Sequence, residues 1–393
     1  MIFLVLAVIA APLVITTVFL AEIVAGLAPM RVARISELAD PELADKRVTL
    51  LMPAHDEAQI LDAIIGRLAP ELDGWARLLV VADNCVDETA AIARARGADV
   101  AERHDSTQRG KGYALDFGRA RLRSDPPDAV IVFDADCFSD RASLQALAAS
   151  ALAWNRPCQA INLIAPLAGS SPLVQLSNFA FMIKNLIRMR GLQRLTGRAH
   201  LLGTGMAFPW PLFDGASLAS ANIVEDVELG LALDRAGTPP QLVTAARIWS
   251  DPSSTEGTLI QRTRWEGGFL ALAFSKAPPA LARALRTIDP RALLAALDLC
   301  IPPLTMLAMI DGAVLLLAAV LTWSSGAPWW PVLLHLTVLI ATLLGIGVAW
   351  AREGRPFIAA ATLLRIPLYM LWKIPLYLGL ARGKSAGWLR PDR

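Results

Sequence analysis

Long apolar runs near both ends of the chain flank a middle part in which apolar and polar stretches alternate. Residues 2–27 carry one charge, Glu22, and exceed the roughly 20 apolar residues that a spanning helix needs. Residues 301–323 and 331–350 are two further runs of this kind. The pattern predicts three transmembrane helices, and the first is expected to be retained because it lacks the basic start and the cleavage site of a signal peptide.

The last apolar run, residues 356–381, contains Arg365 and Lys373 near its middle. Charges there are unfavourable in a span, so we expect a helix that lies at the membrane surface. Basic residues favour the cytoplasmic side, which predicts an outside N-terminus and a cytoplasmic catalytic region in a multi-pass inner or plasma membrane protein. The residues that carry this orientation are Arg31, Arg34, Arg352, Arg355 and the tail 382–393.

Between about residues 47 and 285, short apolar stretches with strand-like composition alternate with stretches of helical period. This βαβαβ order predicts an α/β fold with a mostly parallel sheet and a ligand crevice at the carboxyl ends of its strands. The expected parts are an N-terminal helix, a catalytic domain, a C-terminal membrane region and a basic tail, at residues 1–30, 45–285, 292–381 and 382–393. Residues 171–194 combine helical spacing with basic residues and predict an amphipathic helix on the cytoplasmic leaflet.

Acidic residues follow three of the predicted strands where these strands end. In "VIVFDADCFSD" an apolar run leads into Asp134 and Asp136, and two neighbouring carboxylates repel each other unless a cation lies between them. A phosphatase with a nucleophilic Asp-x-Asp is disfavoured because two βα units precede this strand. A calcium loop is disfavoured because the turn glycine and the final glutamate are missing. The other polar residues at strand ends are His55, Asp56, Glu57, Asp83, Asn84 and Asp87.

Composition narrows the class of protein. Hydrophobic residues make up 55% of the chain and charged residues 18%, with a mean hydropathy of +0.47, which is too apolar for a soluble protein. The formal net charge of +2, without a basic stripe, gives no reason to expect nucleic-acid binding. The four cysteines show no paired spacing, so we expect reduced thiols in a cytoplasmic domain and no zinc site.

Seven short motifs, taken in order, resemble those of the membrane-bound family 2 glycosyltransferases, which have a GT-A fold. They are "PAHDE" (53–57), "DNCVDET" (83–89), "RGKGYAL" (109–115), "DAD" (134–136), "GTGMAF" (203–208), "IVEDVELGLAL" (223–233) and "QRTRW" (261–265). The resemblance covers roughly residues 45–275. Gln-x-x-Arg-Trp after an Asp-x-Asp and a Glu-Asp is its most specific part.

The resemblance implies a nucleotide-sugar donor, most simply a UDP-sugar. Asp83 would contact the base or ribose, with Glu57 a candidate for the same subsite, although Glu57 could instead cap a helix. Lys111 lies between two glycines and would bring its charge to the nucleotide. Asp136 would bind Mg²⁺ or Mn²⁺, and Asp134 would contact the sugar or the nucleotide.

The same resemblance implies inverting chemistry, in which a carboxylate takes the proton of the acceptor hydroxyl. Asp226, the second acid of the Glu-Asp pair, would be this base, with Glu225 as the alternative. The family often has Thr before the pair where this chain has Val224. Both acids could also simply complement the N-terminus of a helix.

The implied acceptor site draws on the last motifs. Gln261, Arg264 and Trp265 would share one face of a helical turn. Arg264 would reach the diphosphate, and Gln261 and Trp265 would bind the acceptor. Arg262, off that face, is expected in solvent or at lipid headgroups, and Gly205 in "GTGMAF" would allow the acceptor to approach closely.

The sequence thus predicts a membrane glycosyltransferase that acts on a lipid-linked or glycan acceptor and contacts membrane lipids. A processive β-polysaccharide synthase of the cellulose, chitin or hyaluronan type is the alternative, although three spans are few for a translocation channel. A non-catalytic membrane scaffold is an alternative of another class. Oligomerisation and partners in polysaccharide assembly stay open.

Overall fold

The computed structural model describes residues 1–28, 43, 45–167, 169–220, 222 and 224–381. Arg31, Arg34 and the tail 382–393, on which part of the predicted orientation depends, lie outside these residues. The chain forms two compact units that interleave along the sequence. Unit 1 comprises Met1–Pro29, Pro166–Gly197 and Pro252–Arg393, and unit 2 comprises Met30–Ala165 and Arg198–Asp251.

Unit 2 is built on one eight-stranded sheet with the strand order β3-β2-β1-β4-β7-β6-β8-β5. Parallel pairs join β1 to β2 and β4, β2 to β3, and β6 to β8, so only β7 and β5 run against the other strands. The predicted mostly parallel sheet is therefore confirmed. The strands are β1 (Val48–Ala54), β2 (Ala76–Asp83), β3 (Asp99–Arg103), β4 (Ala129–Val132), β5 (Cys137–Phe138), β6 (Cys158–Ile164), β7 (Met206–Pro209) and β8 (Gln241–Ser250).

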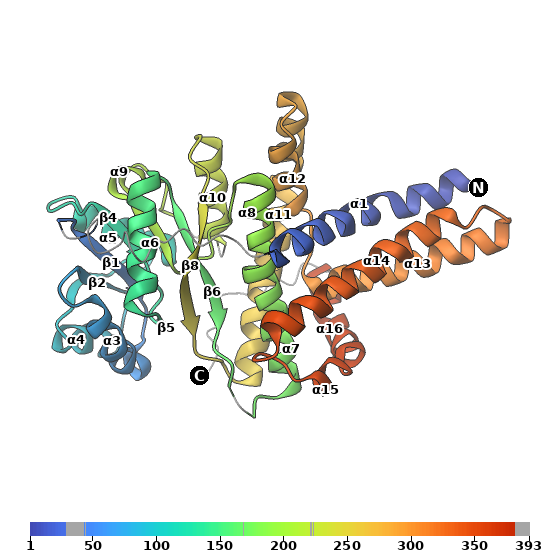
Figure 1. The fold of residues 1–393 in the computed structure, drawn as a ribbon. Helices are drawn as coiled ribbons and strands as arrows, with labels where there is room; N and C mark the ends of the chain where they lie inside the picture. The colour runs from blue at the N-terminus through green and yellow to red at the C-terminus, as the bar shows by residue number, and fades with distance from the viewer. Residues whose placement is uncertain (29–42, 44, 168, 221, 223, 382–393) are drawn as a thin grey trace. The chain divides into compact units, whose positions relative to one another are not determined.

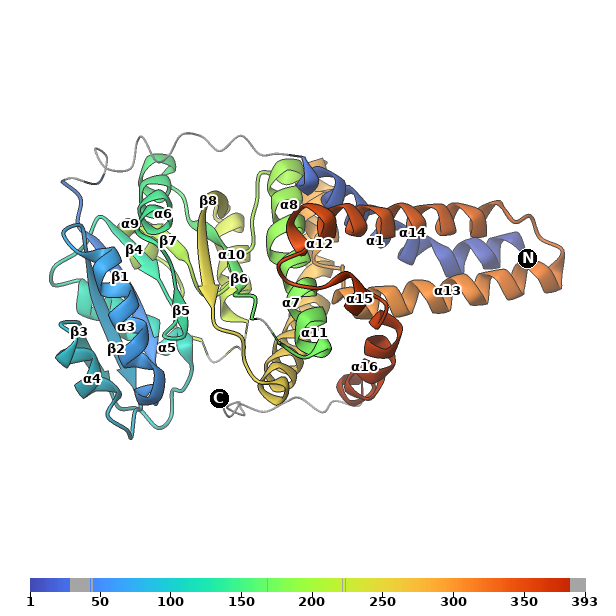
Figure 2. The ribbon, with the colours of Figure 1, turned by 60° about the horizontal axis from the view of Figure 1, so that its bottom comes forward.

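Helices cover both faces of this sheet (Figures 1 and 2). One apolar core joins the sheet to α3, α4 and α6, and a second joins its other face to α5, α9 and α10. Burial on both faces explains why β1, β4 and β6 read as nearly unbroken apolar runs. These helices are α3 (Ala58–Leu72), α4 (Thr89–Ala95), α5 (Lys111–Leu122), α6 (Arg141–Trp154), α9 (Trp210–Asp214) and α10 (Glu225–Arg235).

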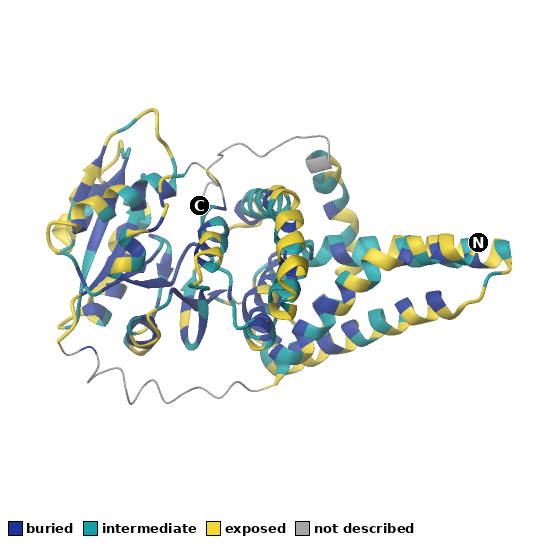
Figure 3. Cartoon of the chain, turned by 90° about the horizontal axis from the view of Figure 1, so that it is seen from above, coloured by how far each residue is buried: buried dark blue, intermediate teal, exposed yellow. Residues whose placement is uncertain are grey.

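Unit 1 contains three helices that are long and apolar enough to cross a membrane, at Ile2–Leu27, Leu304–Ser325 and Trp330–Gly354. They run side by side as α1, α13 and α14 with its extension η2 (Figures 1 and 2). Many residues of these helices are exposed (Figure 3). Large apolar side chains such as Leu316 and Leu344 are among the exposed ones. An exposed apolar surface of this kind is stable in lipid, so the predicted apolar helices are confirmed in number and position.

The remaining helices of unit 1 pack at one end of these three. Residues 356–381 include α15 and α16, and the membrane-surface position predicted for this segment stays a prediction. The helices of unit 1 are α1 (Ile2–Leu27), α7 (Pro172–Met182), the π-helical η1 (Ile183–Arg188), α8 (Met189–Thr196), α11 (Thr255–Thr287), α12 (Pro290–Asp298), α13 (Leu304–Ser325), α14 (Trp330–Ala349), the π-helical η2 (Trp350–Gly354), α15 (Ala360–Leu363) and α16 (Ile366–Ala381).

The segment predicted to lie on the membrane surface, residues 171–194, packs closely against α1. A Cβ added to Gly191 would lie 2.0 Å from the carbonyl oxygen of Glu22, so the two helix backbones touch. Arg188 is buried between Glu22 on α1 and Asp298 on α12, with nitrogen to oxygen distances of 2.8 and 2.7 Å. The surface prediction is therefore wrong for this inner face, because its arginine is satisfied inside the protein.

A second buried polar group links the three long helices. Thr16 on α1 donates to Asp311 on α13, and Nε2 of His335 on α14 lies 3.3 Å from the same carboxylate. Each of these three side chains is almost fully buried. Polar residues inside apolar helix bundles fix which helix faces meet, so this group specifies the packing of α1, α13 and α14.

Candidate active site

The carboxyl ends of β1, β2 and β4 lie along one edge of the sheet, and the predicted polar residues follow them. β1 ends at Ala54, β2 at Asp83 and β4 at Val132. Because these strands are parallel neighbours, their end loops meet at the same edge. The sequence prediction that the strand-end acids share one region of unit 2 is therefore borne out by the strand order.

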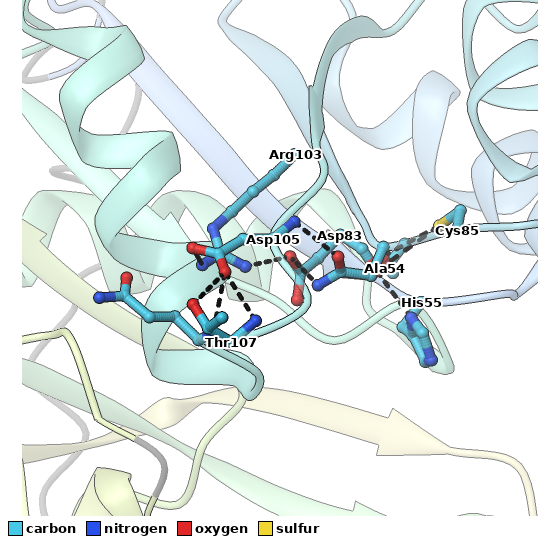
Figure 4. A network of polar contacts seen from close by, with 9 residues as sticks. Ala54, His55, Asp83, Cys85, Arg103, Asp105 and Thr107 are labelled. Atoms are coloured by element: carbon cyan, nitrogen blue, oxygen red, sulfur yellow. Dashed lines mark hydrogen bonds and ion pairs between the residues drawn. The ribbon is translucent and has the colours of Figure 1, made fainter.

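Asp83, the predicted nucleotide contact, forms a buried ion pair with Arg103 at the end of β3. Nη1 of Arg103 lies 2.6 Å from Oδ1 of Asp83 (Figure 4). The amide of Asn84 donates to the same oxygen, and Arg103 also lies 3.2 Å from Asp105. Sequence reasoning missed Arg103, whose charge at the end of a neighbouring strand was the available signal.

A tight turn precedes Lys111. The carboxylate of Asp105 accepts hydrogen bonds from the backbone of Gln108 and from Thr107, and these bonds lower the pKa of Asp105 to about 2 (Figure 4). Asp105 is therefore ionised at physiological pH, and the turn it stabilises leads into the first residue of α5, which is Lys111.

Lys111 lies among the predicted catalytic acids. Its ammonium pairs with Asp134 and donates to the carbonyl oxygen of Gly203 at 2.8 Å. A Cβ added to Gly203 would lie 3.2 Å from Nζ of Lys111 and 3.3 Å from Oδ2 of Asp226, so both side chains border one position. Burial opposes the charge of Lys111, but the carboxylates of Asp134, Glu225 and Asp226 outweigh this and raise its pKa above the ordinary value.

Gly112 explains why glycine flanks this lysine. A Cβ at Gly112 would lie 2.4 Å from the carbonyl oxygen of Leu218 and 2.8 Å from that of Ser220. No side chain fits at that distance, so glycine lets the start of α5 touch the 218–220 loop. Gly112 therefore has a packing reason for being glycine.

Glu225 and Asp226 form the first turn of α10. The backbone N–H of Val227 donates to Oδ1 of Asp226 at 2.8 Å, which fixes that carboxylate. Burial and the neighbouring charge of Asp226 raise the pKa of Glu225 to about 8. Glu225 therefore holds a proton at neutral pH and cannot accept another, which favours Asp226 as the base of the pair.

Asp134 and Asp136 are arranged as a possible metal site. One oxygen of each carboxylate and Sγ of Cys137 all lie within 4.8 Å of one another. The backbone N–H of Asp134 donates to Oγ1 of Thr204, and the thiol of Cys137 donates to Asp136. Hard divalent cations prefer carboxylate oxygens, so Mg²⁺ or Mn²⁺ fits the two aspartates.

Helix capping was the alternative role for Glu57, but the side chain that caps α3 is that of Asp87. The carboxylate of Asp87 accepts from the backbone N–H of Ala58 at the start of α3 and of Thr89 at the start of α4. The backbone N–H of Glu57 donates to Oγ1 of Thr89. Asp87 therefore caps both α3 and α4, and at α3 it fills the capping role considered for Glu57.

Gly205 has a packing reason for being glycine. Its φ is +63°, and a Cβ there would lie 2.4 Å from Cγ1 of Ile248 and 3.1 Å from Cβ of Ala160. The residue therefore lets the start of β7 approach β6 and β8. Its predicted contact with the acceptor stays a prediction.

The residues of the last motif lie on α11, in unit 1. Trp265 stacks on Phe181 with ring centroids 5.7 Å apart, and Gln261 and Arg264 are partly buried. The prediction for Arg262 is wrong: its side chain is buried, donates to Oγ of Ser177 at 2.7 Å and lies over the Phe181 ring. The spacing showed which face of the helix Arg262 occupies but not that α7 covers that face.

Comparison with known proteins gives one family and several similar folds. Residues 46–268 match the model of the family described as glycosyltransferase like family 2. A similar solved structure is the mannosyltransferase PcManGT from Pyrobaculum calidifontis in complex with GDP-Man and Mn²⁺, with a TM-score of 0.56, 18% identity and 98% of each chain covered.

Another similar structure is glucosyl-3-phosphoglycerate synthase from Mycobacterium tuberculosis in complex with Mn²⁺, UDP and glucosyl-3-phosphoglycerate. Its TM-score is 0.41 at 18% identity, with 62% of this chain and 85% of that chain covered. None of the curated proteins matches the chain.

Proposed function

The chain belongs to the glycosyltransferase like family 2, and on this basis we propose that it transfers a sugar, with inversion, from a UDP-sugar to a lipid-linked or glycan acceptor. The α/β fold of unit 2 is GT-A-like. The observation that carries the proposal is the grouping of Lys111, Asp134 and Asp226 around Gly203, beside Asp136. This group offers a cation for phosphate and carboxylates for both a metal and a proton.

Binding of the donor is proposed to use the edge formed by β2 and β4. Asp83 accepts hydrogen bonds from the base or the ribose, and its ion pair with Arg103 holds the carboxylate in place. Glu57 is assigned to the same subsite. The ammonium of Lys111 contacts the donor's phosphate side, where its raised pKa keeps it charged. Arg264 is assigned to the diphosphate because its fork of donors fits paired phosphate oxygens.

Asp136, together with Asp134, would hold Mg²⁺ or Mn²⁺, which would offset the charge that develops on the leaving diphosphate. Asp134 has a second task, because its pair with Lys111 fixes the lysine on the phosphate side of the donor. The similar mannosyltransferase was solved in complex with GDP-Man and Mn²⁺, which supports this assignment.

Proton transfer is assigned to Asp226. Inversion requires the acceptor hydroxyl to attack from the side opposite the leaving group while a carboxylate takes its proton. Asp226 is oriented by the backbone of Val227, and Glu225 keeps its own proton at neutral pH. Gln261, Trp265 and Gly205 are assigned to the acceptor.

The long apolar helices of unit 1 are the basis for the proposed acceptor and membrane location. Among the residues that the structure describes, three helices could cross a membrane, and a translocation channel would require more, which favours a lipid-linked acceptor over processive synthesis. We place the catalytic region on the cytoplasmic side. A reporter fused after Arg393 is then expected in the cytoplasm, and a signal from outside would refute this orientation.

The function is tested by incubating the purified chain and membrane lipids with a panel of nucleotide sugars and identifying products by mass spectrometry. UDP-hexoses and UDP-N-acetylhexosamines test the proposal, and GDP-mannose belongs in the panel because the similar mannosyltransferase holds it. A sugar added to lipid supports the proposal, whereas long polymer favours the processive alternative. Neither transfer nor hydrolysis of any donor would favour the scaffold.

A further inference from the structure

The part of α11 beyond the Gln-x-x-Arg-Trp motif carries exposed apolar side chains along one side. Phe274 and Leu285 are 80% and 64% exposed, and Ile288, which directly follows the helix, is 87% exposed. Pro278 and Leu281 come between them, and steps of three and four residues place the set on one face of the helix. An apolar stripe of this length is unfavourable in water and indicates a contact with something outside the chain.

Basic side chains accompany this stripe. Arg283 and Arg286 on α11 and Arg291 on α12 are all exposed. The sequence has no acidic residue between Glu266 and Asp289, and the carboxylate of Asp289 caps α12 by accepting from the backbone N–H of Arg291 at 2.9 Å. The end of the α11–α12 hairpin therefore combines an apolar stripe with positive charge, and a matching partner is both apolar and negatively charged.

Ile288, at the turn between the two helices, has a backbone conformation that its side chain disfavours. Its φ is +50° and its ψ is 38°, the left-handed conformation that ends α11. Glycine usually fills this position at the end of a helix, and a β-branched residue there is rare. Because the Ile288 side chain is also exposed, packing within the described chain does not explain it. Strain at an exposed apolar residue points to a functional contact.

The hairpin leads directly into one of the long apolar helices. α12 ends at Asp298, and α13 begins at Leu304. The nine residues of α12 extend for about 13 Å, so Ile288 lies close to the end of α13. Within unit 1, α12 and the last part of α11 run across the direction of α1, α13 and α14 (Figure 1). If α13 crosses a membrane, this hairpin lies along the membrane surface.

We propose that the α11–α12 hairpin binds the surface of a membrane leaflet that contains anionic phospholipids. Phe274, Leu285 and Ile288 enter the boundary between headgroups and acyl chains, and the exposed arginines contact lipid phosphates. An apolar stripe accompanied by arginines is typical of helices that lie in this boundary, and anionic leaflets attract basic side chains. Lipid is favoured over a protein partner because the hairpin continues into α13, whose exposed apolar side chains need lipid.

The sequence pattern predicted a surface-lying amphipathic helix elsewhere, at residues 171–194, and grouped residues 274–285 with the catalytic domain. In the structure, α11 belongs to unit 1 together with the three long apolar helices. The exposure of the stripe could not be predicted, because an apolar stripe of helical period is equally typical of a face that is buried in a domain core. The inference does not depend on the proposed transfer reaction.

Photo-crosslinking of the full-length chain in nanodiscs tests the proposal. The photoreactive amino acid p-benzoylphenylalanine replaces Ile288 or, in a second protein, Leu285, and the discs contain equal amounts of phosphatidylcholine and phosphatidylglycerol. Irradiation should attach phospholipid at both positions, as detected by mass spectrometry of the labelled peptides. Leu316, exposed on α13, is the positive control. Val86, a β-branched residue in the loop after β2 that is 91% exposed, is the matched negative control and should acquire no lipid.

The role of the arginines is tested in the same discs. With the native arginines, phosphatidylglycerol adducts should exceed phosphatidylcholine adducts by at least about twofold, and Arg283→Gln combined with Arg286→Gln should make the two equal. Arg121→Gln combined with Arg235→Gln removes two exposed arginines of unit 2 and should keep the preference. The proposal is overturned if positions 285 and 288 acquire no lipid, if they crosslink to a second copy of the chain instead, or if the native arginines give no preference.

Discussion

Lys111 in unit 2 and Arg188 in unit 1 are both cations that contact carboxylates, yet their surroundings differ. About a quarter of the Lys111 side chain and a third of that of Asp134 are exposed. Arg188 is 12% exposed, and its partners Glu22 and Asp298 are 2% and 5% exposed. A ligand can therefore reach the first group, whereas protein covers most of the second.

The comparison teaches that access, more than the charges themselves, separates a binding group from a structural one. Around Lys111 the carboxylates of Asp134 and Asp226 outnumber the cation, and a metal or a substrate can join them. Around Arg188 the two carboxylates come from α1 and α12, so the arginine ties these helices to η1. Removing each cation should accordingly damage different properties.

The largest effect is expected from Arg188→Met. It leaves Glu22 and Asp298 buried without their cation, which should lower the free energy of unfolding by about 3–5 kcal/mol. Arg190→Met is the matched control, because the Arg190 to Glu353 pair is more exposed and should contribute only about 0–1 kcal/mol. Thermal unfolding in one detergent measures both. Equal midpoints for the two variants would contradict the structural role of Arg188.

Lys111→Met should affect turnover more than folding. Losing the cation proposed for the phosphate side of the donor should lower turnover about 10²–10³-fold. The unfolding midpoint should fall less than in Arg188→Met, because water can solvate the acids around Lys111. Lys46→Met, an exposed lysine of the same unit, is the control and should act like wild type. A Lys111→Met protein that transfers sugar normally would refute the role of this lysine.

A smaller effect is expected on the pH dependence of stability, to which Glu225 contributes. Its pKa in the folded protein, about 8, lies above the ordinary value of 4.5. Protonation therefore stabilises the fold fully below about pH 4.5, and this contribution is lost as the pH rises toward 8. Glu225→Gln keeps the neutral form and should flatten the fall in unfolding midpoint across this window. A wild-type slope retained in Glu225→Gln would show that another group causes it.

Much of the fold follows from local pattern. The buried runs of β1, β2 and β4, the helix at 111–122 and the three apolar helices could be predicted, because burial on both faces or in lipid dictates residue type directly. The antiparallel pairing of β7 with β4 could not be predicted, because the direction of pairing depends on the whole chain segment that connects the two strands.

For the site, the sequence predicted which residues belong to it but not how they are arranged. Strand ends marked Asp83, Asp134 and Asp136, but which side chains pair depends on distances across the sheet. Arg103 reaches Asp83 from a neighbouring strand, and Lys111 reaches Gly203, which is 92 residues away in the chain. Arg262 was misjudged for the same reason, since the segment that buries it is 85 residues away.

The central claim is that Asp226 removes the acceptor proton in a metal-dependent sugar transfer. It is tested most directly by measuring UDP affinity, by calorimetry with Mn²⁺, and turnover, by product formation, in wild type and Asp226→Asn. A base acts in the transition state, so we predict near-normal affinity with a loss of turnover of about 10²–10⁴-fold. Asp83→Ala should instead weaken UDP binding, with a smaller loss of turnover at saturation. Normal turnover in Asp226→Asn would contradict the account and make Glu225 the next residue to test.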